Sequence, residues 1–237
     1  MQVVRSSAEF SLTRGHTYFA PAMSPSAMII DAGAHRLEFA MIMHRRFGCS
    51  VIALEPNASL LATPHASGVR VLVAALASRD GPVSFTIDEN PEASTIVPLE
   101  SAPAEGWYIE AFSLETVMKQ AGRPMIDLLK LDVEGAEFGV LLETDENVIK
   151  RFKQITVEFH DFLPRFSGLG LVNQVRRRMR QLGFLGIRSS VRTNGDVLFL
   201  NRSEFDIGSR VRALLPWTLP VRRKQLEGIE LTELRQG

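Results

Sequence analysis

The stretch D-L-L-K-L-D-V-E-G-A-E, residues 127–137, carries the clearest information about the fold. Its first half is a short apolar run, which is typical of a strand buried on both faces of a sheet. Its second half is acidic and contains Gly135, which favours a turn. The apolar residues Phe138, Val140 and Leu141 then follow at helical spacing. The segment therefore predicts a strand, an acidic turn and a helix, in that order.

Other apolar runs end in the same way. Asp31 follows the run at residues 28–30, and Glu55 follows the run at residues 50–54. A third run, residues 154–159, contains Glu158 and is followed by His160. An amphipathic helix is expected over residues 36–47 and a strongly basic helix over residues 171–182. Strands that alternate with helices at this spacing predict a mostly parallel α/β sheet with helices on both faces. Residues 184–191 and 196–201 predict an antiparallel hairpin that closes the sheet at its C-terminal end.

Length and composition favour one domain. The chain has 237 residues, of which 45% are hydrophobic and 23% are charged, and its formal net charge is zero. We expect a leader over 1–26, the α/β domain over 27–202 and a tail over 203–237. The neutral balance argues against a nucleic-acid partner, because binding to a phosphate backbone requires a strongly basic surface.

The cellular compartment is also predicted. Cys49 is the only cysteine and cannot form an internal disulfide, which fits a reducing compartment and a buried structural thiol. No apolar run approaches the roughly 20 residues of a membrane span. Charges and hydroxyls occupy residues 1–19, where a signal peptide would need an apolar stretch. We therefore expect a cytoplasmic protein without a transmembrane segment.

In parallel sheets, ligands bind outside the carboxyl ends of the strands, at the point where the strand order reverses. The first such loop contains Asp31, Gly33, Ala34 and His35, at the start of a predicted helix whose free N–H groups favour anions. Glu55 lies 22 residues after Gly33, where a Rossmann-like site places the carboxylate that binds ribose hydroxyls. An NAD-linked oxidoreductase shares this logic, but its G-x-G-x-x-G loop is absent from the sequence.

The segment 127–137 resembles the signature of the FkbM-type methyltransferases, a strand that runs into Asp-x-Glu-Gly-x-Glu. Supporting stretches are I-A-L-E-P-N at 52–57, A-A-L at 74–76 and V-E-F-H at 157–160. The resemblance implies a Rossmann-like class I methyltransferase fold and S-adenosylmethionine as cofactor. It also implies O-methylation of a hydroxyl on a sugar or secondary metabolite, so that the partner is a small-molecule or glycan acceptor.

The resemblance and the geometry of such sheets together assign the cofactor-binding residues. The first loop would face the methionine part, Glu55 would bind ribose, and Ala75 would flank adenine. Asp132 would hold the cofactor's ammonium or the acceptor. The expected cofactor-binding set is Asp31, Gly33, Ala34, His35, Glu55, Pro56, Asn57, Ala75 and Asp132. The chain departs from the family's first loop, Asp-x-Gly-Ala-Asn-x-Gly, because His35 replaces the asparagine and Leu37 the second glycine.

The expected catalytic residues are His160, Asp132 and Glu134. His160 is the candidate general base, because the ordinary pKa of histidine lies near neutrality. A structural role beside Glu158 is the alternative for His160. No residue is assigned to a resident metal, but a magnesium ion held by oxygen ligands of Asp132, Glu134 and Glu158, together with His160, is a further alternative.

Three functional hypotheses and the oligomeric state remain open at this point. An active O-methyltransferase is the first hypothesis. A methyltransferase-fold protein without catalysis is the second, motivated by His35 and Leu37, and the NAD-linked oxidoreductase is the third. A homo-oligomer is an alternative to a monomer.

Overall fold

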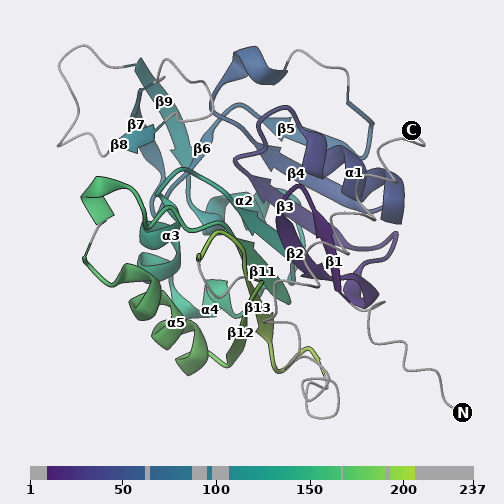
Figure 1. Ribbon diagram of the computed structural model, residues 1–237. Coiled ribbons are helices and arrows are strands. Elements are labelled where there is room, and N and C mark those ends of the chain that lie inside the picture. Colours follow the sequence, from purple (N-terminus) through teal and green to yellow (C-terminus); the bar gives the residue numbers. More distant parts are fainter. Residues whose placement is uncertain are drawn as a thin grey trace, which may run out of the picture.

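The computed structural model describes residues 10–61, 65–86, 95–97, 107–166, 168–189 and 193–205. They form a large central sheet with helices on both faces, a smaller second sheet and an N-terminal hairpin (Figure 1). No helix in these ranges is long and apolar enough to cross a membrane. Residues 1–9 of the expected leader and residues 206–237 of the expected tail lie outside the described residues.

The central sheet has seven strands in the order β12-β13-β11-β10-β3-β4-β5. Five are parallel, namely β3 (Met28–Ala32), β4 (Ser50–Leu54), β5 (Val69–Leu72), β10 (Leu128–Leu131) and β11 (Gln154–Val157). At the far edge, β12 (Phe184–Arg188) and β13 (Val197–Asn201) form the expected antiparallel hairpin. The predicted fold class is confirmed.

Side-chain alternation explains why both faces of the sheet are buried. Ile30, Ile52 and Leu129 belong to one apolar cluster, whereas Ile29 and Val51 belong to another. Successive residues of a strand point to opposite faces, so continuous apolar runs bury both sides. These continuous apolar runs are therefore the reason why the strands could be predicted correctly from the sequence.

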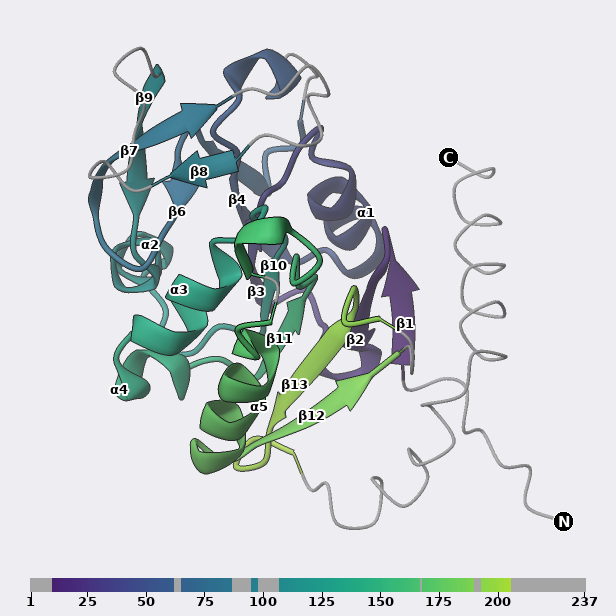
Figure 2. The same ribbon diagram turned by 60° about the vertical axis from the view of Figure 1, so that its left-hand side comes forward.

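Helices cover the face of the sheet to which Ile30, Ile52 and Leu129 point, which we call the first face. The cluster there includes side chains from α2 (Leu114–Ala121), α3 (Glu137–Glu143) and α5 (Leu171–Gln181), and the short helix α4 (Glu146–Ile149) follows α3. Figure 2 shows α3 and α5 on one side of the sheet and α1 (Glu38–Phe47) on the other. The N-cap Ser113 of α2 accepts a hydrogen bond from the Thr116 N–H, as capping chemistry requires.

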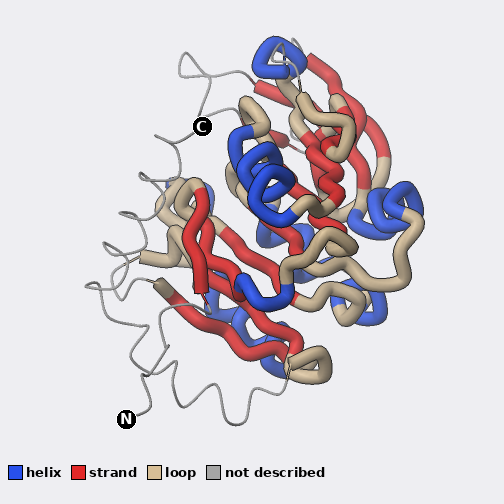
Figure 3. Tube along the Cα trace, turned by 90° about the vertical axis from the view of Figure 1, so that its right-hand side faces the viewer, coloured by secondary structure: helices blue, strands red, loops and turns tan. Residues whose placement is uncertain are grey.

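A hairpin of β1 (Phe10–Thr13) and β2 (His16–Phe19) completes the second face beside α1. Its apolar side chains Phe10, Leu12 and Phe19 pack with Leu198 and Leu200 of β13. Figure 3 views the backbone from the side on which this hairpin lies. The buried Asp196 accepts hydrogen bonds from both the backbone N–H and the hydroxyl of Thr17. Part of the segment expected as a leader thus covers the sheet.

The second sheet was not anticipated from sequence. It consists of β6 (Ala75–Leu76), β9 (Trp107–Phe112), β7 (Gly81–Thr86) and β8 (Thr95–Val97), in that order. Of these strands, the sequence predicts only the β7 region, from the apolar–polar alternation of residues 83–87. Among the described residues, 3-10 helices cover Ala20–Ala22, Ala58–Leu61 and Pro164–Phe166.

Candidate functional site

A cavity of about 370 Å³ opens at the carboxyl ends of the parallel strands. It lies at the switch point, because the chain proceeds from β3 to β4 and β5 in one direction and later to β10 and β11 in the other. Seven of the expected cofactor-binding residues line it, namely Gly33, Ala34, His35, Glu55, Pro56, Ala75 and Asp132. The three expected catalytic residues, His160, Asp132 and Glu134, line it as well.

Gly33 is required by the packing of the chain against itself. A Cβ at this position would lie 1.7 Å from the carbonyl oxygen of Asp132, and Gly33 has a φ of +75°. The first loop therefore closes directly onto the end of β10. The absence of a side chain at Gly33 therefore makes room for the neighbouring backbone.

Asp31 lies inside β3 and does not line the cavity. It is fully buried beside Lys130, whose Nζ lies 3.2 Å from Asp31 Oδ1 and donates to the Gly33 carbonyl at 2.8 Å. Burial alone would lower the Lys130 pKa, but Asp31 and Asp132 outweigh it and raise that pKa. Asp31 and Lys130 together tie β3 to β10 beneath the cavity. Lys130 was not assigned from sequence, although a lysine within an apolar strand needs a buried partner.

Glu55 organises the loops after β3 and β4. Its two carboxylate oxygens accept hydrogen bonds from the backbone N–H groups of His35 and Asn57, both at 2.8 Å. Burial raises the Glu55 pKa, and these hydrogen bonds partly oppose the shift. A carboxylate has about four acceptor positions, so two remain for ligand hydroxyls. Asn57 itself caps the helix that follows, through its side chain to Ser59, and does not line the cavity.

His160 is held by carboxylates on both of its ring nitrogens. Nδ1 lies 2.9 Å from Oε1 of the fully buried Glu137, which also accepts the Val133 N–H at 2.9 Å. Nε2 lies 3.2 Å from Glu134 Oε2. Burial lowers the His160 pKa, but Glu137 and Glu134 outweigh it and raise the pKa to about 9. The ring is therefore protonated at neutral pH.

The acidic turn after β10 is strained where its carboxylates enter the cavity. Glu134 has a φ of +53° and is followed by Gly135 at +103°. Burial is the main cause that raises the Glu134 pKa to about 7. Non-glycine residues rarely adopt positive φ, and such strain gathers at functional sites.

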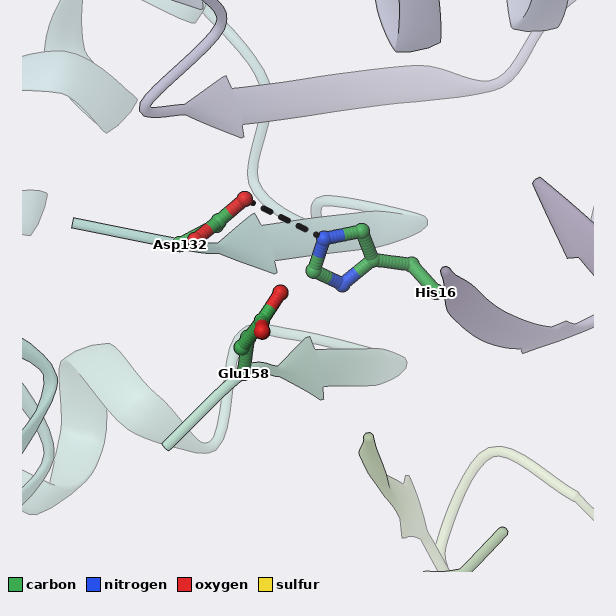
Figure 4. Close-up of side chains that lie close together, drawn as sticks. All are labelled: His16, Asp132 and Glu158. Carbon is green, nitrogen blue, oxygen red and sulfur yellow. Dashed lines mark ion pairs between the residues drawn. The ribbon is translucent and has the colours of Figure 1, made fainter. Parts of the chain in front are cut away.

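Asp132 lies at the centre of the charged groups. Burial would raise its pKa, but Lys130, His16 and His160 hold that pKa well below its usual range. Figure 4 shows Asp132, Glu158 and His16 facing one another, with 3.5 Å between His16 Nε2 and Asp132 Oδ2. His16 comes from the hairpin in the expected leader, and nothing in the local sequence marks it as a site residue.

His35 and Leu37, the two residues that depart from the family's first loop, both affect the backbone conformation. His35 and Leu37 both adopt positive φ, +49° and +64°, where asparagine and glycine are favoured. Leu37 is only 1% exposed and packs with Ala34, Phe39 and Met43 in the core beside α1. It does not line the cavity. The leucine therefore strains the backbone but leaves the cavity open.

The methyltransferase FkbM domain model matches residues 31–185, which contain this loop, the β10 motif and His160. The chain belongs to the FkbM methyltransferase family. This is a family of S-adenosylmethionine-dependent enzymes, and the strand order of the central sheet is that of the class I fold. The family match argues against the NAD-linked oxidoreductase.

The chain is also similar to individual methyltransferases. The chain is 28% identical over 181 residues to "Methyltransferase sdnD" from Sordaria araneosa, covering 60% of this chain and 70% of that protein. The structure of a precorrin-6y C5,15-methyltransferase from Geobacter metallireducens is 12% identical in sequence, with a TM-score of 0.38. The match covers 70% of this chain and 67% of the precorrin-6y methyltransferase chain. The structure of a TehB-like methyltransferase from Corynebacterium glutamicum is also 12% identical, with a TM-score of 0.37. The match covers 74% of this chain and 80% of the TehB-like chain.

Proposed function

We propose that this FkbM-family chain transfers the methyl group of S-adenosylmethionine to a hydroxyl oxygen of a small-molecule or glycan acceptor. The observation that supports it most is the convergence of the strand ends on one cavity, where carboxylates outnumber cationic groups. Asp132, Glu134 and Glu158 face this space, whereas the charge of Lys130 is balanced by Asp31. A surplus of negative charge suits a donor that carries both a sulfonium and an ammonium group.

The donor fits the half of the cavity bounded by β3, β4 and β6. Glu55 would bind the ribose hydroxyls with its remaining acceptor positions, and Ala75 would lie beside the adenine. The backbone around Gly33 and His35 would contact the methionine part. Asp132 would bind the ammonium group. When bound, the donor supplies an activated methyl group on positively charged sulfur.

The acceptor would enter on the side of Glu134, Glu158 and His160. Methyl transfer forms a C–O bond and breaks the C–S bond, whose electron pair remains on sulfur, and the hydroxyl proton must leave. We assign proton removal to the pair formed by Glu134 and His160, with Glu137 fixing the ring from behind. This revises the lone-histidine base expected from sequence, because both ring nitrogens already face carboxylates.

Methyl transfer can be tested with S-adenosylmethionine labelled with ¹³C in its methyl group and a panel of sugars and hydroxylated metabolites. We expect a product whose ¹³C shift is that of a methyl ether. An N-methyl product would contradict the oxygen assignment. Donor binding without turnover of any acceptor would favour the non-catalytic alternative.

Magnesium, a cytoplasmic location and a homo-oligomeric state remain predictions. The carboxylate oxygens of Asp132, Glu134 and Glu158 are ligands that magnesium accepts. Loss of turnover in EDTA and its recovery with Mg²⁺ would support a magnesium requirement, whereas EDTA-resistant turnover would argue against it. Cell fractionation and light scattering test the location and the assembly state.

A further inference from the structure

His16 is a buried histidine whose ring has no hydrogen bond. The residue is 1% exposed, and neither Nδ1 nor Nε2 has a hydrogen-bond partner among the described residues. Phe39 packs edge-on against the ring at 5.9 Å between centroids. Burying a polar group without a hydrogen-bond partner destabilises the fold. A buried imidazole of this kind is suited to an additional ligand.

The ring is directed at two carboxylates. One ligand atom from each of His16, Asp132 and Glu158 lies within 4.8 Å of the others, and Figure 4 shows the three side chains around a common space. Asp132 and Glu158 follow adjacent parallel strands, β10 and β11, and the β1–β2 hairpin covers that face of the sheet. We propose that His16, Asp132 and Glu158 bind a divalent first-row transition-metal ion.

A second cluster, Asp132 with Glu134 and His160, also satisfies the distance criterion. Its histidine, however, is already engaged, because Nδ1 bonds Glu137 and Nε2 lies 3.2 Å from Glu134. An ion in the first cluster would satisfy the His16 ring, whose two nitrogens have no hydrogen-bond partner among the described residues, whereas Glu137 and Glu134 already satisfy the His160 ring without an ion. We therefore place the ion in the first cluster, His16 with Asp132 and Glu158.

The donor set decides the class of ion. One imidazole nitrogen beside two carboxylates suits manganese, iron, cobalt or zinc, whereas magnesium prefers oxygen ligands and retains its waters. Lys130 lies 3.5 Å from Asp132 Oδ2, but its charge is shared with Asp31 on the opposite side. Three protein ligands leave coordination positions open, as catalytic metal sites do.

Asp132 and Glu158 line the cavity, so an ion held by them and His16 would lie next to the side where we place the acceptor. There the ion would bind the acceptor hydroxyl oxygen and lower its pKa, so that the proton passes more readily to the Glu134–His160 pair. Only this role rests on the proposed function, because metal binding by the three residues can be measured without donor or acceptor.

Mn²⁺ binding to the metal-stripped full-length chain, followed by electron paramagnetic resonance, tests the proposal. We expect saturable binding of one ion per chain, displaced by Zn²⁺ far better than by Mg²⁺. His16→Phe, which retains an aromatic ring beside Phe39, and Glu158→Gln should each weaken binding by about tenfold or more. His65→Ala, an exposed histidine, serves as the matched control and should bind like the wild type.

The outcomes separate this inference from the proposed function. Absence of saturable Mn²⁺ binding, or binding that His16→Phe and Glu158→Gln leave unchanged, overturns the site. Loss in Glu134→Gln with retention in His16→Phe places the ion in the second cluster and also overturns it. Glu158→Gln keeps the test decisive if His16→Phe does not fold. Titration with S-adenosylmethionine in EDTA reports on the proposed function independently.

Discussion

At the scale of single residues, several buried charges near the cavity are held by structural partners that explain their state. Glu137 is the clearest case, since one of its oxygens bonds both the Val133 N–H and the His160 ring. It is the last residue of the Asp-x-Glu-Gly-x-Glu motif, but its role was not predicted. The contact depends on the chain returning after β11, which no local pattern reveals.

We expect Glu137→Gln to lower kcat by about a hundredfold while leaving donor affinity unchanged, because the ring loses its fixed orientation. The His160 pKa, followed by NMR in EDTA, should fall from about 9 by about one unit or more. Glu143→Gln, an exposed position on the same helix, is the control. An unchanged His160 pKa would contradict the assignment.

Leu37→Gly relieves the positive φ but removes a buried side chain. Relief of the backbone strain at positive φ stabilises the fold by about 1–2 kcal/mol, whereas truncation of a buried leucine destabilises it by about 2–5 kcal/mol. We therefore expect a net loss of about 1–3 kcal/mol in the free energy of unfolding, measured with urea. A more stable Leu37→Gly variant would mean that the leucine is a defect of the loop and not part of the core.

Cys49 is a buried thiol whose pKa burial raises to about 11. We expect no reaction with iodoacetamide at pH 8 in the folded protein, and rapid reaction in urea. Because the folded pKa exceeds the ordinary value of 9.0, the thiol's contribution to stability is present below pH 9 and is lost as the pH rises toward 11. The stability of the wild type relative to Cys49→Ala should fall over that interval, and a constant difference would argue against the shift.

At the scale of elements, the N-terminal hairpin takes the place that a helix occupies elsewhere on the sheet. Its turn brings Arg14 to the cavity, where Arg14 pairs with Glu38 at the start of α1, and it places His16 beside Asp132. The helices and parallel strands were predicted because their periodicity is local. The hairpin and the second sheet were not, since pairing between short strands depends on distant partners.

Thr17→Val should remove one of the two hydrogen bonds to the buried Asp196 and destabilise the fold by about 1–3 kcal/mol. Mn²⁺ binding should weaken with it, because His16 is the adjacent residue, whereas donor binding should persist. Thr116→Val removes a similar hydroxyl–carboxylate contact to Asp80 at an exposed site and should cost less. Equal losses in the two variants would show that the hairpin is not specifically anchored.

At the scale of the whole molecule, the reversal of strand order between β3 and β10 places the site. The carboxylates that end the strands could be located from sequence, and most of them meet in one cavity. Asp31 and Asn57 did not follow this expectation, because buried Lys130 and the Asn57 helix cap use their side chains elsewhere. Strand ends alone therefore identify the edge of the sheet but not the orientation of each side chain.

Calorimetric titration with S-adenosylmethionine tests the central claim most directly, with Glu55→Gln beside the wild type and the exposed Glu146→Gln as control. We predict saturable binding of one molecule per chain, unchanged in the control. Hydrogen bonds to a charged group contribute about 1.5–3 kcal/mol, so Glu55→Gln should weaken affinity by about tenfold or more. Absence of binding by the wild type, or equal affinity in Glu55→Gln, would contradict the assignment of this cavity to the methyl donor.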